Sequence, residues 1–350
     1  MAETFVDLFA GAGGLSWGLQ DAGMKCLLAS DHWSDAVKTY AHNMPDHPVI
    51  ERDIRDLSVE ELARRLPSRP DWIVGGPPCQ GYSTVGKRNR EDPRNVLFLE
   101  FRRIVAGIRP SGFVIENVLG LKDMSYEQEV AESFRNLGYQ VKFMVLTAAE
   151  HGVPQLRRRV VFVGHKDRGL FQGPAITHDV NTYVSVEEAI GDLPILGAGE
   201  SATEYSSDPV TPYQKEIRER SVSLQGHSVS KHPPHLVRAI SHIPDGGNRK
   251  SIPDRYQPSG GFHNSYSRLA SWLPAVAITQ NLGKPSGTRC IHPTQDRGLT
   301  TREGARLQSF PDRFHFLGTV TSQRLQVGNA VPPRMASALG SALTDPHRWF

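Results

Sequence analysis

Hydrophobic positions in the first half of the chain form short runs that alternate with segments of helical spacing. Six runs predict β-strands: TFVDLF (4–9), KCLLAS (25–30), DWIVGG (71–76), GFVIENV (112–118), QVKFMVLTA (140–148) and RRVVFVGH (158–165). Between them, segments 14–23, 34–43, 96–108 and 126–138 have the spacing of helices. Strands that alternate with helices predict βαβ units on a parallel sheet, so the expected fold class is α/β.

The pattern changes near Asp179. Beyond it Pro, Ser, Gly and His become frequent and periodicity is lost, until helical patterns return in TREGARLQSF (301–310) and PPRMASALGSALT (332–344). A chain of 350 residues is also long for a single core. We therefore expect one domain over 1–178, a second over 179–319, and a segment 320–350 that returns to the first.

Cysteine use and hydropathy exclude several classes of protein. The 3 cysteines are Cys26, Cys79 and Cys290, without a Cys-x-x-Cys pair, so neither a disulfide framework nor a metal site is expected. No segment approaches the ~20 apolar residues of a membrane-spanning helix, and no signal-peptide pattern starts the chain. We expect a cytoplasmic protein that does not bind a membrane.

Charge is unevenly distributed although the net charge is only +3. In 180–226 acidic residues outnumber Lys and Arg by 8 to 3, whereas 227–268 has six Lys and Arg against two Asp. A phosphate backbone would suit this basic segment, but a solvated basic surface explains it equally well. Its cations are Lys231, Arg238, Arg249, Lys250, Arg255 and Arg268.

Three strand ends in the first half carry residues typical of a nucleoside site. The first strand leads into a turn with Gly11 and Gly13 before a helix, where backbone amides can approach a ligand. Asp31 follows about 20 residues later, where a carboxylate can accept both ribose hydroxyls. Asp53 could accept an exocyclic amine, with Ile54 against a purine face. Together these positions predict an adenosine pocket, although each acid alone is more often a turn or cap residue.

The segment GGPPCQGYS places Cys79 just after a predicted strand, at the carboxyl edge of the sheet. Pro77 and Pro78 restrict this loop, and a cysteine in such a loop is more often reactive than one inside a strand. Glu116 in VIENV lies at the carboxyl end of the next strand, at the same edge of the sheet. We therefore expect a thiol nucleophile and a protonatable carboxyl to face one cleft.

The segment PQLRRRVVFVG adds two arginines. Gln155, Arg157 and Arg159 alternate along this predicted strand, so we expect all three to point to one face. Guanidinium groups beside a thiol and a carboxyl would bind phosphate or carbonyl oxygen and favour the thiolate. A basic strand on the surface is the alternative.

The blocks DLFAGAGG, GGPPCQGYS, ENV, QLRRR, TREGARLQSFP and QVGNAVPP, in this order, resemble the DNA (cytosine-5)-methyltransferase family. The resemblance covers 4–164 and 264–340, and 180–263 takes the place of that family's target recognition domain. It implies a Rossmann-like class I methyltransferase sheet with helices on both faces, plus a smaller irregular domain inserted near the C-terminal end. Two departures are Tyr82 where phenylalanine is common, and ERD where a glycine often precedes the acid, Asp53.

The resemblance implies methyl transfer from S-adenosylmethionine to carbon 5 of a flipped-out cytosine in double-stranded DNA, with S-adenosylhomocysteine as product. It makes Cys79 the nucleophile and Glu116 the carboxyl at the cytosine edge, with Arg157 and Arg159 beside the base. A monomer on DNA is expected, and a companion restriction endonuclease is left open. The implied cofactor contacts are Phe9, Gly11, Gly13, Leu15, Asp31, His32, Asp53, Ile54, Pro77, Leu97, Asn329 and Val331.

Three other functions share parts of these patterns. A nicotinamide-dependent oxidoreductase would use the glycine turn and the ribose acid, but gives no role to Cys79, Glu116 and the arginines together. A DNA-binding protein without catalysis would not need both the thiol and the carboxyl. A transfer-RNA methyltransferase of the same fold is the closest alternative, but the Cys-Phe-Thr signature of such proteins is absent here. The bases that flank the target depend on loop geometry and are not predicted.

Overall fold

A computed structural model describes residues 2–78, 96–118, 125–260, 265–287 and 289–350. The chain divides into two compact units. Unit 1 consists of Met1–Thr147, Arg158–Ile176 and Pro333–Phe350. Unit 2 consists of Ala148–Arg157 and Thr177–Pro332. The chain therefore enters unit 2 twice before it returns to unit 1 at Pro333.

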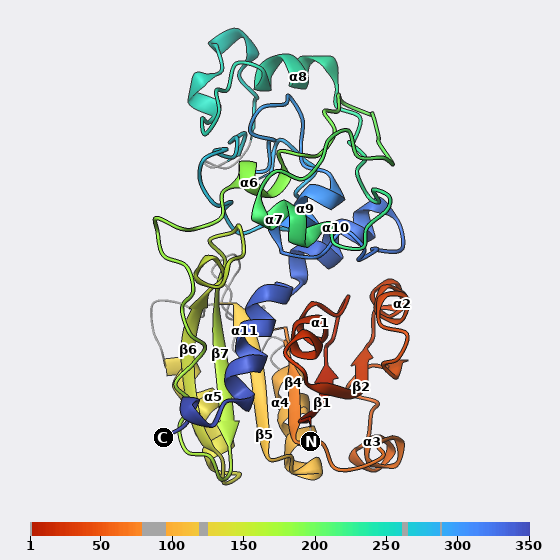
Figure 1. Cartoon of the computed structure of the whole chain (residues 1–350), viewed down its shortest axis with the longest axis vertical. Coiled ribbons are helices and arrows are strands. Elements are labelled where there is room, and N and C mark those ends of the chain that lie inside the picture. Colours follow the sequence, from red (N-terminus) through yellow and green to blue (C-terminus); the bar gives the residue numbers. More distant parts are fainter. Residues whose placement is uncertain (1, 79–95, 119–124, 261–264, 288) are drawn as a thin grey trace. The chain divides into compact units, whose positions relative to one another are not determined.

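Unit 1 is built on a seven-stranded sheet with the order β3-β2-β1-β4-β5-β7-β6 (Figure 1). The first five strands are parallel, and β7 lies between β5 and β6 and runs antiparallel to both. The predicted α/β class is confirmed, but the fully parallel sheet is wrong at β7. The connection 148–157 is shorter than the dozen or so residues that a parallel crossover needs. The strands are β1 Thr4–Leu8, β2 Lys25–Asp31, β3 Val49–Glu51, β4 Trp72–Gly75, β5 Gly112–Val118, β6 Gln140–Thr147 and β7 Arg158–His165.

Helices cover both faces of this sheet. Successive side chains of a strand point to opposite faces, so both faces carry side chains that pack against helices. From β1, Val6 and Leu8 join an apolar core with residues of α3, α4 and α5. Asp7 points to the other face, where Ser16 of α1 donates a hydrogen bond to it. No helix in the described part of the chain is long and apolar enough to span a membrane. The helices of unit 1 are α1 Gly14–Asp21, α2 Ser34–Asn43, α3 Val59–Arg65, α4 Val96–Ile108, α5 Ser125–Arg135 and α11 Pro333–Thr344.

Unit 2 has short helices joined by long irregular segments, as the loss of periodicity predicted. Its interior contains arginines whose guanidinium groups bind backbone carbonyls. Arg268, for example, is 5% exposed and donates to the carbonyls of Ile240, Ile243 and His292. Irregular segments leave such carbonyls without a ladder partner, so side chains must satisfy them. The helices of unit 2 are α6 Val186–Ile190, α7 Pro212–Ile217, α8 Pro234–Ile240, α9 Thr301–Leu307 and α10 Val320–Asn329.

Candidate active site

The turn between β1 and α1 leaves backbone open to a ligand. Gly11 has a φ of 54°, and a Cβ atom added there would meet nothing within 4 Å. Gly13, the N-cap of α1, has a φ of 97°, and a Cβ there would lie 2.2 Å from Met44 Cε. Phe9 also adopts a left-handed conformation, with a φ of 62°, which is strained for a residue with a side chain. The start of α1 can therefore receive a ligand group against its backbone.

Asp31 ends β2 and is oriented by two backbone amides. Its Oδ2 accepts a hydrogen bond from Gly11 N at 2.8 Å, and its Oδ1 accepts one from Trp33 N at 2.8 Å. The carboxylate retains free lone pairs, so it can still accept ribose hydroxyls. The neighbouring His32 side chain is 71% exposed, and its hydrogen bond to Asp31 raises the pKa of His32. The structure thus joins the glycine turn and Asp31, as the sequence predicted.

Asp53 is held by a neighbouring side chain. Arg55 donates to Oδ1 at 2.9 Å and to Oδ2 at 2.5 Å, and this hydrogen bonding lowers the pKa of Asp53 to about 2. Asp53 is therefore an ionised acceptor at neutral pH, but a ligand amine must share it with Arg55. The next residue, Ile54, is 5% exposed and packs in the apolar core of unit 1, with Leu97 at the border of that core.

The loop that leads to Cys79 is anchored to the neighbouring strand. Pro77 is buried, and its carbonyl accepts a hydrogen bond from Asn117 Nδ2 at 2.9 Å. Asn117 Oδ1 in turn accepts one from Val118 N at 2.8 Å, which orients the amide. Cys79 itself lies outside the described residues. The backbone two residues before it is thus fixed to the end of β5.

Glu116 and Arg159 form an ion pair on adjacent strands. Arg159 Nε lies 2.9 Å from Glu116 Oε1, and their side chains are only 14% and 11% exposed. Because Val118 is opposite Arg159 in the ladder, Glu116 and Arg159 are diagonal neighbours on one face. Glu116 Oε2 also lies 3.3 Å from the position of a Cβ on Gly76. The carboxylate, the guanidinium and the start of the Cys79 loop therefore come together at one sheet edge.

Arg157 is not part of the strand that carries Arg159. β7 begins one residue after Arg157, and both Gln155 and Arg157 belong to unit 2. The expectation that these side chains alternate along one strand is therefore wrong. Arg157 donates to the carbonyls of Ile278 at 3.3 Å and Gly328 at 3.2 Å, and Gln155 Oε1 accepts from Ile278 N at 2.7 Å. These side chains bind backbone groups of unit 2 instead of extending β7.

Two of the predicted cofactor contacts also belong to unit 2. Asn329 is the last residue of α10 and is exposed, whereas Val331 is partly buried two residues later. The sequence did not predict α10, because Val320, Leu325 and Val327 do not gather on one helix face.

The two cysteines of the described residues are buried. Cys26 Sγ lies 3.6 Å from Tyr40 Oη, and Cys290 Sγ donates to the Lys284 carbonyl at 2.5 Å. Burial raises the pKa of each thiol to about 12. Neither forms much thiolate at neutral pH, so neither is suited to nucleophilic catalysis.

Sequence reasoning missed two polar residues near these strand ends. Asn117 of the ENV block is one of them, and it anchors Pro77. Asp7 is fully buried and accepts a hydrogen bond from Ser16 at 2.6 Å, and burial raises its pKa to about 7. A carboxyl inside the apolar run FVDLF is itself the signal that could have identified Asp7.

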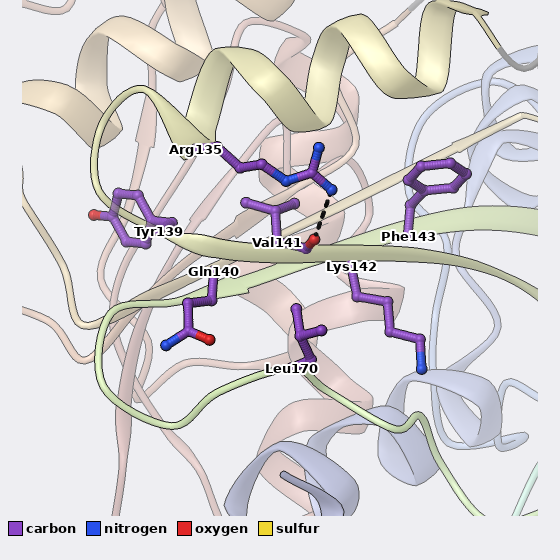
Figure 2. Close-up of a pocket in the computed structure, with 7 residues that line it drawn as sticks. All are labelled: Arg135, Tyr139, Gln140, Val141, Lys142, Phe143 and Leu170. Carbon is purple, nitrogen blue, oxygen red and sulfur yellow. Dashed lines mark hydrogen bonds between the residues drawn. The ribbon is translucent and has the colours of Figure 1, made fainter. Parts of the chain in front are cut away.

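One pocket of about 550 Å³ lies elsewhere in unit 1 (Figure 2). Arg135 of α5 points over the start of β6 and donates to the Val141 carbonyl at 3.1 Å. Gln140 is paired with His165 at the end of β7, so the pocket lies away from the Glu116–Arg159 edge. Its lining contains none of the described residues predicted for catalysis or cofactor binding. The lining residues are Arg135, Tyr139, Gln140, Val141, Lys142, Phe143 and Leu170.

Known proteins resemble the chain over nearly its whole length. Residues 3–345 match the family of C-5 cytosine-specific DNA methylases. The type II methyltransferase M1.HphI of Haemophilus parahaemolyticus is 40% identical over 350 residues, which cover 98% of this chain and 87% of that protein. M.DdeI of Desulfomicrobium norvegicum is 39% identical over 370 residues, which cover 97% and 88%.

A solved structure also resembles the chain over nearly its whole length. A protein described as a DNA modification methyltransferase encoded within an E. coli prophage superposes with a TM-score of 0.78 and 26% identity, covering 98% of both chains. The chain therefore belongs to the C-5 cytosine-specific DNA methylase family, that of the DNA (cytosine-5)-methyltransferases.

Proposed function

We propose that the protein methylates carbon 5 of a flipped-out cytosine in double-stranded DNA, with Cys79 as the covalent nucleophile. The observation that carries this proposal is the Glu116–Arg159 ion pair beside the anchored loop that leads to Cys79. The DNA methylase family and the type II relatives favour DNA over the alternative substrate, transfer RNA. The enzyme would act as a monomer on DNA in the cytoplasm.

The β1–α1 turn and the neighbouring strand ends would hold S-adenosylmethionine. The open space at Gly11 suits close contact with the backbone, and Asp31 is already oriented to accept ribose hydroxyls. When bound, this cofactor supplies an electrophilic methyl group and leaves as S-adenosylhomocysteine. The other proposed contacts are Phe9, Gly13, Leu15, His32, Asp53, Ile54, Pro77, Leu97, Asn329 and Val331.

Cys79 would act by making carbon 5 of cytosine nucleophilic. The thiolate adds to carbon 6, which turns the ring into an enamine whose carbon 5 can attack a methyl group. Glu116 donates a hydrogen bond or a proton to ring nitrogen 3, and Arg159 stabilises charge at the ring carbonyl oxygen. A base, to which we assign no residue, then removes the carbon 5 proton. The Cys79–carbon 6 bond breaks, the thiolate leaves, and ring nitrogen 3 returns to Glu116 any proton that it received.

The anchoring contacts would serve the geometry of this addition. Flipping a base out of the duplex costs a few kcal/mol. A nucleophile that is already in place avoids an additional entropic cost when it meets the flipped base. Asn117 would position the Cys79 loop through Pro77, and Arg159 would position Glu116. Arg157 remains a proposed catalytic residue on the family resemblance alone, since it donates hydrogen bonds to backbone carbonyls of unit 2.

Substitution of the cysteines tests the covalent mechanism. Cys79→Ser should abolish methyl transfer and preserve cofactor binding, whereas Cys26→Ser, a change at a buried thiol, should remain active. DNA with 5-fluorocytosine should form an adduct with the wild type that survives denaturation. A base can remove a proton from carbon 5 but cannot remove fluorine, so Cys79 is not released. A preparation that methylates normally but forms no adduct would refute the mechanism.

Glu116→Gln tests the carboxyl. Gln can still form a hydrogen bond but cannot supply a proton, so single-turnover methylation should fall ~10²- to 10⁴-fold with little change in DNA affinity. Glu132→Gln, on the exposed surface of α5, is the matched control. A Glu116→Gln enzyme with a near-normal single-turnover rate would leave Glu116 only a structural partner of Arg159.

Unit 2 is proposed to select the target sequence. Lys231, Arg238, Lys250 and Arg255 of the basic segment are exposed, which suits phosphate contacts. Arg268 is buried on backbone carbonyls, so we remove it from the set of candidate DNA contacts. Exchange of residues 180–263 with those of a relative should change which cytosine bisulfite sequencing reports as methylated. An unchanged site would contradict the assignment, and neighbouring genes would show whether a restriction endonuclease accompanies the enzyme.

A further inference from the structure

Strand β6 is an edge of the seven-stranded sheet, and it pairs with β7 alone. Just beyond β6, Ala148 N donates to the Arg157 carbonyl at 2.8 Å in the same register. Hydrogen-bonded pairs alternate along an antiparallel ladder, so the even-numbered residues of β6 bond to β7. The N–H and C=O groups of Val141, Phe143 and Val145 therefore point outward. In the described part of the chain, no backbone group bonds to them.

A side chain takes the place of a ladder partner at one of these outward groups. Arg135 of α5 donates to the Val141 carbonyl at 3.1 Å, as expected for a carbonyl that has no neighbouring strand. Arg135 also lies 3.3 Å from Glu132, but both side chains are largely exposed, at 45% and 60%. Such an exposed ion pair contributes little stability. The guanidinium can therefore exchange these contacts for a ligand.

The pocket of about 550 Å³ in unit 1 lies over this outward side of β6 (Figure 2). Its lining includes the consecutive residues 139–143, and successive side chains of a strand point to opposite faces. Figure 2 shows Arg135 and Val141 on one side of β6 and Lys142 on the other. A pocket confined to one face would be lined by alternate residues only. This pocket therefore extends around the edge of the strand.

The charge around the pocket is positive on both sides of the strand. Arg135 lies on one side and Lys142 on the other, and none of the lining residues is acidic. Lys142 Nζ lies 5.6 Å from the ring centroid of Phe350, and it pairs with no carboxylate of the described residues. Near the start of β6, Lys166 Nζ lies 5.0 Å from the ring centroid of Tyr139. Charge complementarity thus favours an acidic ligand.

We propose that the outer edge of β6 binds an extended acidic segment of another protein as an additional strand. Backbone groups of that segment would pair with the outward groups of Val141, Phe143 and Val145. An N–H of the segment would replace Arg135 at the Val141 carbonyl and release the guanidinium for a carboxylate. Two neighbouring acids point to opposite faces of a strand, so one would reach Arg135 and the other Lys142.

This site is independent of the proposed DNA methylation, because it lies away from the Glu116–Arg159 edge. Two synthetic peptides of equal composition test it. In Thr-Val-Glu-Glu-Val-Thr the two acids point to opposite faces, whereas in Thr-Glu-Val-Glu-Val-Thr they share one face. The first peptide should bind roughly 2- to 5-fold more tightly, because only it can pair with both cations. Fluorescence anisotropy of labelled peptides measures the ratio.

Charge variants and backbone methylation test the two parts of the contact separately. Arg135→Gln or Lys142→Gln should abolish the difference between the peptides, whereas Arg64→Gln on exposed α3 should preserve it. Thermal unfolding verifies that each variant is folded. N-methylation of one alternate set of peptide residues should weaken binding roughly 10-fold or more, because it removes the N–H groups that face β6. N-methylation of the other set should have little effect.

Amide hydrogen exchange of the full chain locates the bound peptide. The first peptide should slow exchange at Val141, Phe143 and Val145, and leave Lys142 and Met144, which already bond to β7, nearly unchanged. Unchanged exchange at the outward amides would overturn the proposal, as would equal binding of both peptides or no binding at millimolar concentration. Self-association through β6 in sedimentation experiments without peptide would make a second copy of the chain the occupant, which would also overturn it.

Discussion

The two units stabilise their interiors in different ways. In unit 1, Phe113 stacks on Phe134 with ring centroids 4.0 Å apart, within a core between sheet and helices. In unit 2, fully buried Arg306 lies between Asp192 and Asp312. Strands and helices satisfy their own backbone groups, so apolar side chains can cover them. Irregular loops cannot, and they need donors from side chains.

Several arginines of unit 2 donate to backbone carbonyls of residues 180–263, in addition to the carboxylates that some of them bind. Arg306 donates to the Ala189 carbonyl at 3.0 Å, Arg297 to that of Leu196 at 3.0 Å, and Arg302 to that of Gln225 at 2.9 Å. Every residue type offers a carbonyl, so these contacts do not depend on which side chains the segment carries. A frame over 268–312 can therefore hold loops of different sequence. The proposed selection of the target sequence by unit 2 would require this property.

The strongest test of the comparison is Arg306→Lys, which keeps the charge but loses the fork of donors. Lysine cannot replace the bonds to Asp192, Asp312 and the Ala189 carbonyl together, so we expect a loss of about 3–5 kcal/mol in the free energy of unfolding. Hydrogen exchange should increase most around 186–192. Arg255→Lys, on the exposed surface of unit 2, is the control. A loss below about 1 kcal/mol at Arg306 would show that charge alone suffices.

Acid should affect the two units in opposite directions. Burial raises the pKa of Asp7 in unit 1 to about 7, so the folded state binds a proton more readily than the unfolded one. Stability from this group falls as pH rises from about 4 to 7. Burial lowers the pKa of His292 in unit 2 to about 4, so stability from this group is lost as pH falls from about 6.5 to 4.

Variants of these two residues should separate the opposing contributions. Relative to the wild type, the free energy of unfolding of Asp7→Asn should rise between about pH 4 and 7, by on the order of 3 kcal/mol. Relative to the wild type, that of His292→Asn should fall over the same pH range. Urea unfolding at several pH values measures both slopes. An Asp7→Asn curve parallel to that of the wild type would contradict the raised pKa of Asp7.

How much the sequence predicted also differs between the units. In unit 1 the helices over 34–43 and 96–108 have the predicted bounds, because their apolar residues repeat with helical spacing. The three-residue strand β3 is too short to show such a repeat. In unit 2, Arg306 and Asp192 are 114 residues apart. A tertiary ion pair of this kind leaves no local pattern.

For the site residues too, prediction from the sequence succeeded in unit 1 and failed at the boundary with unit 2. Gly11, Asp31 and Glu116 were predicted from strand ends, because topology alone brings these ends to one edge. Arg157 resembled Arg159 in sequence, yet it serves unit 2, because the chain changes unit between them. Alternation along a strand could not reveal that boundary.

Phe134→Leu tests the plasticity of the apolar core. Leucine fills much of the space and can repack, so we expect a loss of roughly 1–2 kcal/mol, against 3–5 kcal/mol for Phe134→Ala. Urea unfolding of both variants gives the two values. Equal losses would mean that unit 1 depends on specific ring contacts as strictly as unit 2 depends on its guanidinium groups.

The smallest expected effect comes from a helix cap that occurs in both units. Ser58 Oγ accepts from Glu61 N at 3.0 Å at the start of α3, on the surface. Thr300 Oγ1 accepts from Glu303 N at 3.1 Å at the start of α9, where Thr300 and Glu303 are fully buried. In Ser58→Ala water can replace the lost acceptor, so the loss should be about 0.5–1 kcal/mol.

Water cannot reach the corresponding amide in Thr300→Ala, and His227 Nδ1, 3.0 Å from Thr300 Oγ1, also loses its partner. Unsatisfied buried groups add to the lost cap, so this loss should reach roughly 2–3 kcal/mol. Urea unfolding of the two variants at one pH gives the difference directly. If both variants lose the same free energy of unfolding, burial in unit 2 does not strengthen neutral hydrogen bonds. Only the buried ion pairs would then distinguish unit 2 from unit 1. A larger loss at Thr300 would extend the contrast to neutral hydrogen bonds, since the two variants remove the same kind of acceptor from the same position of a helix.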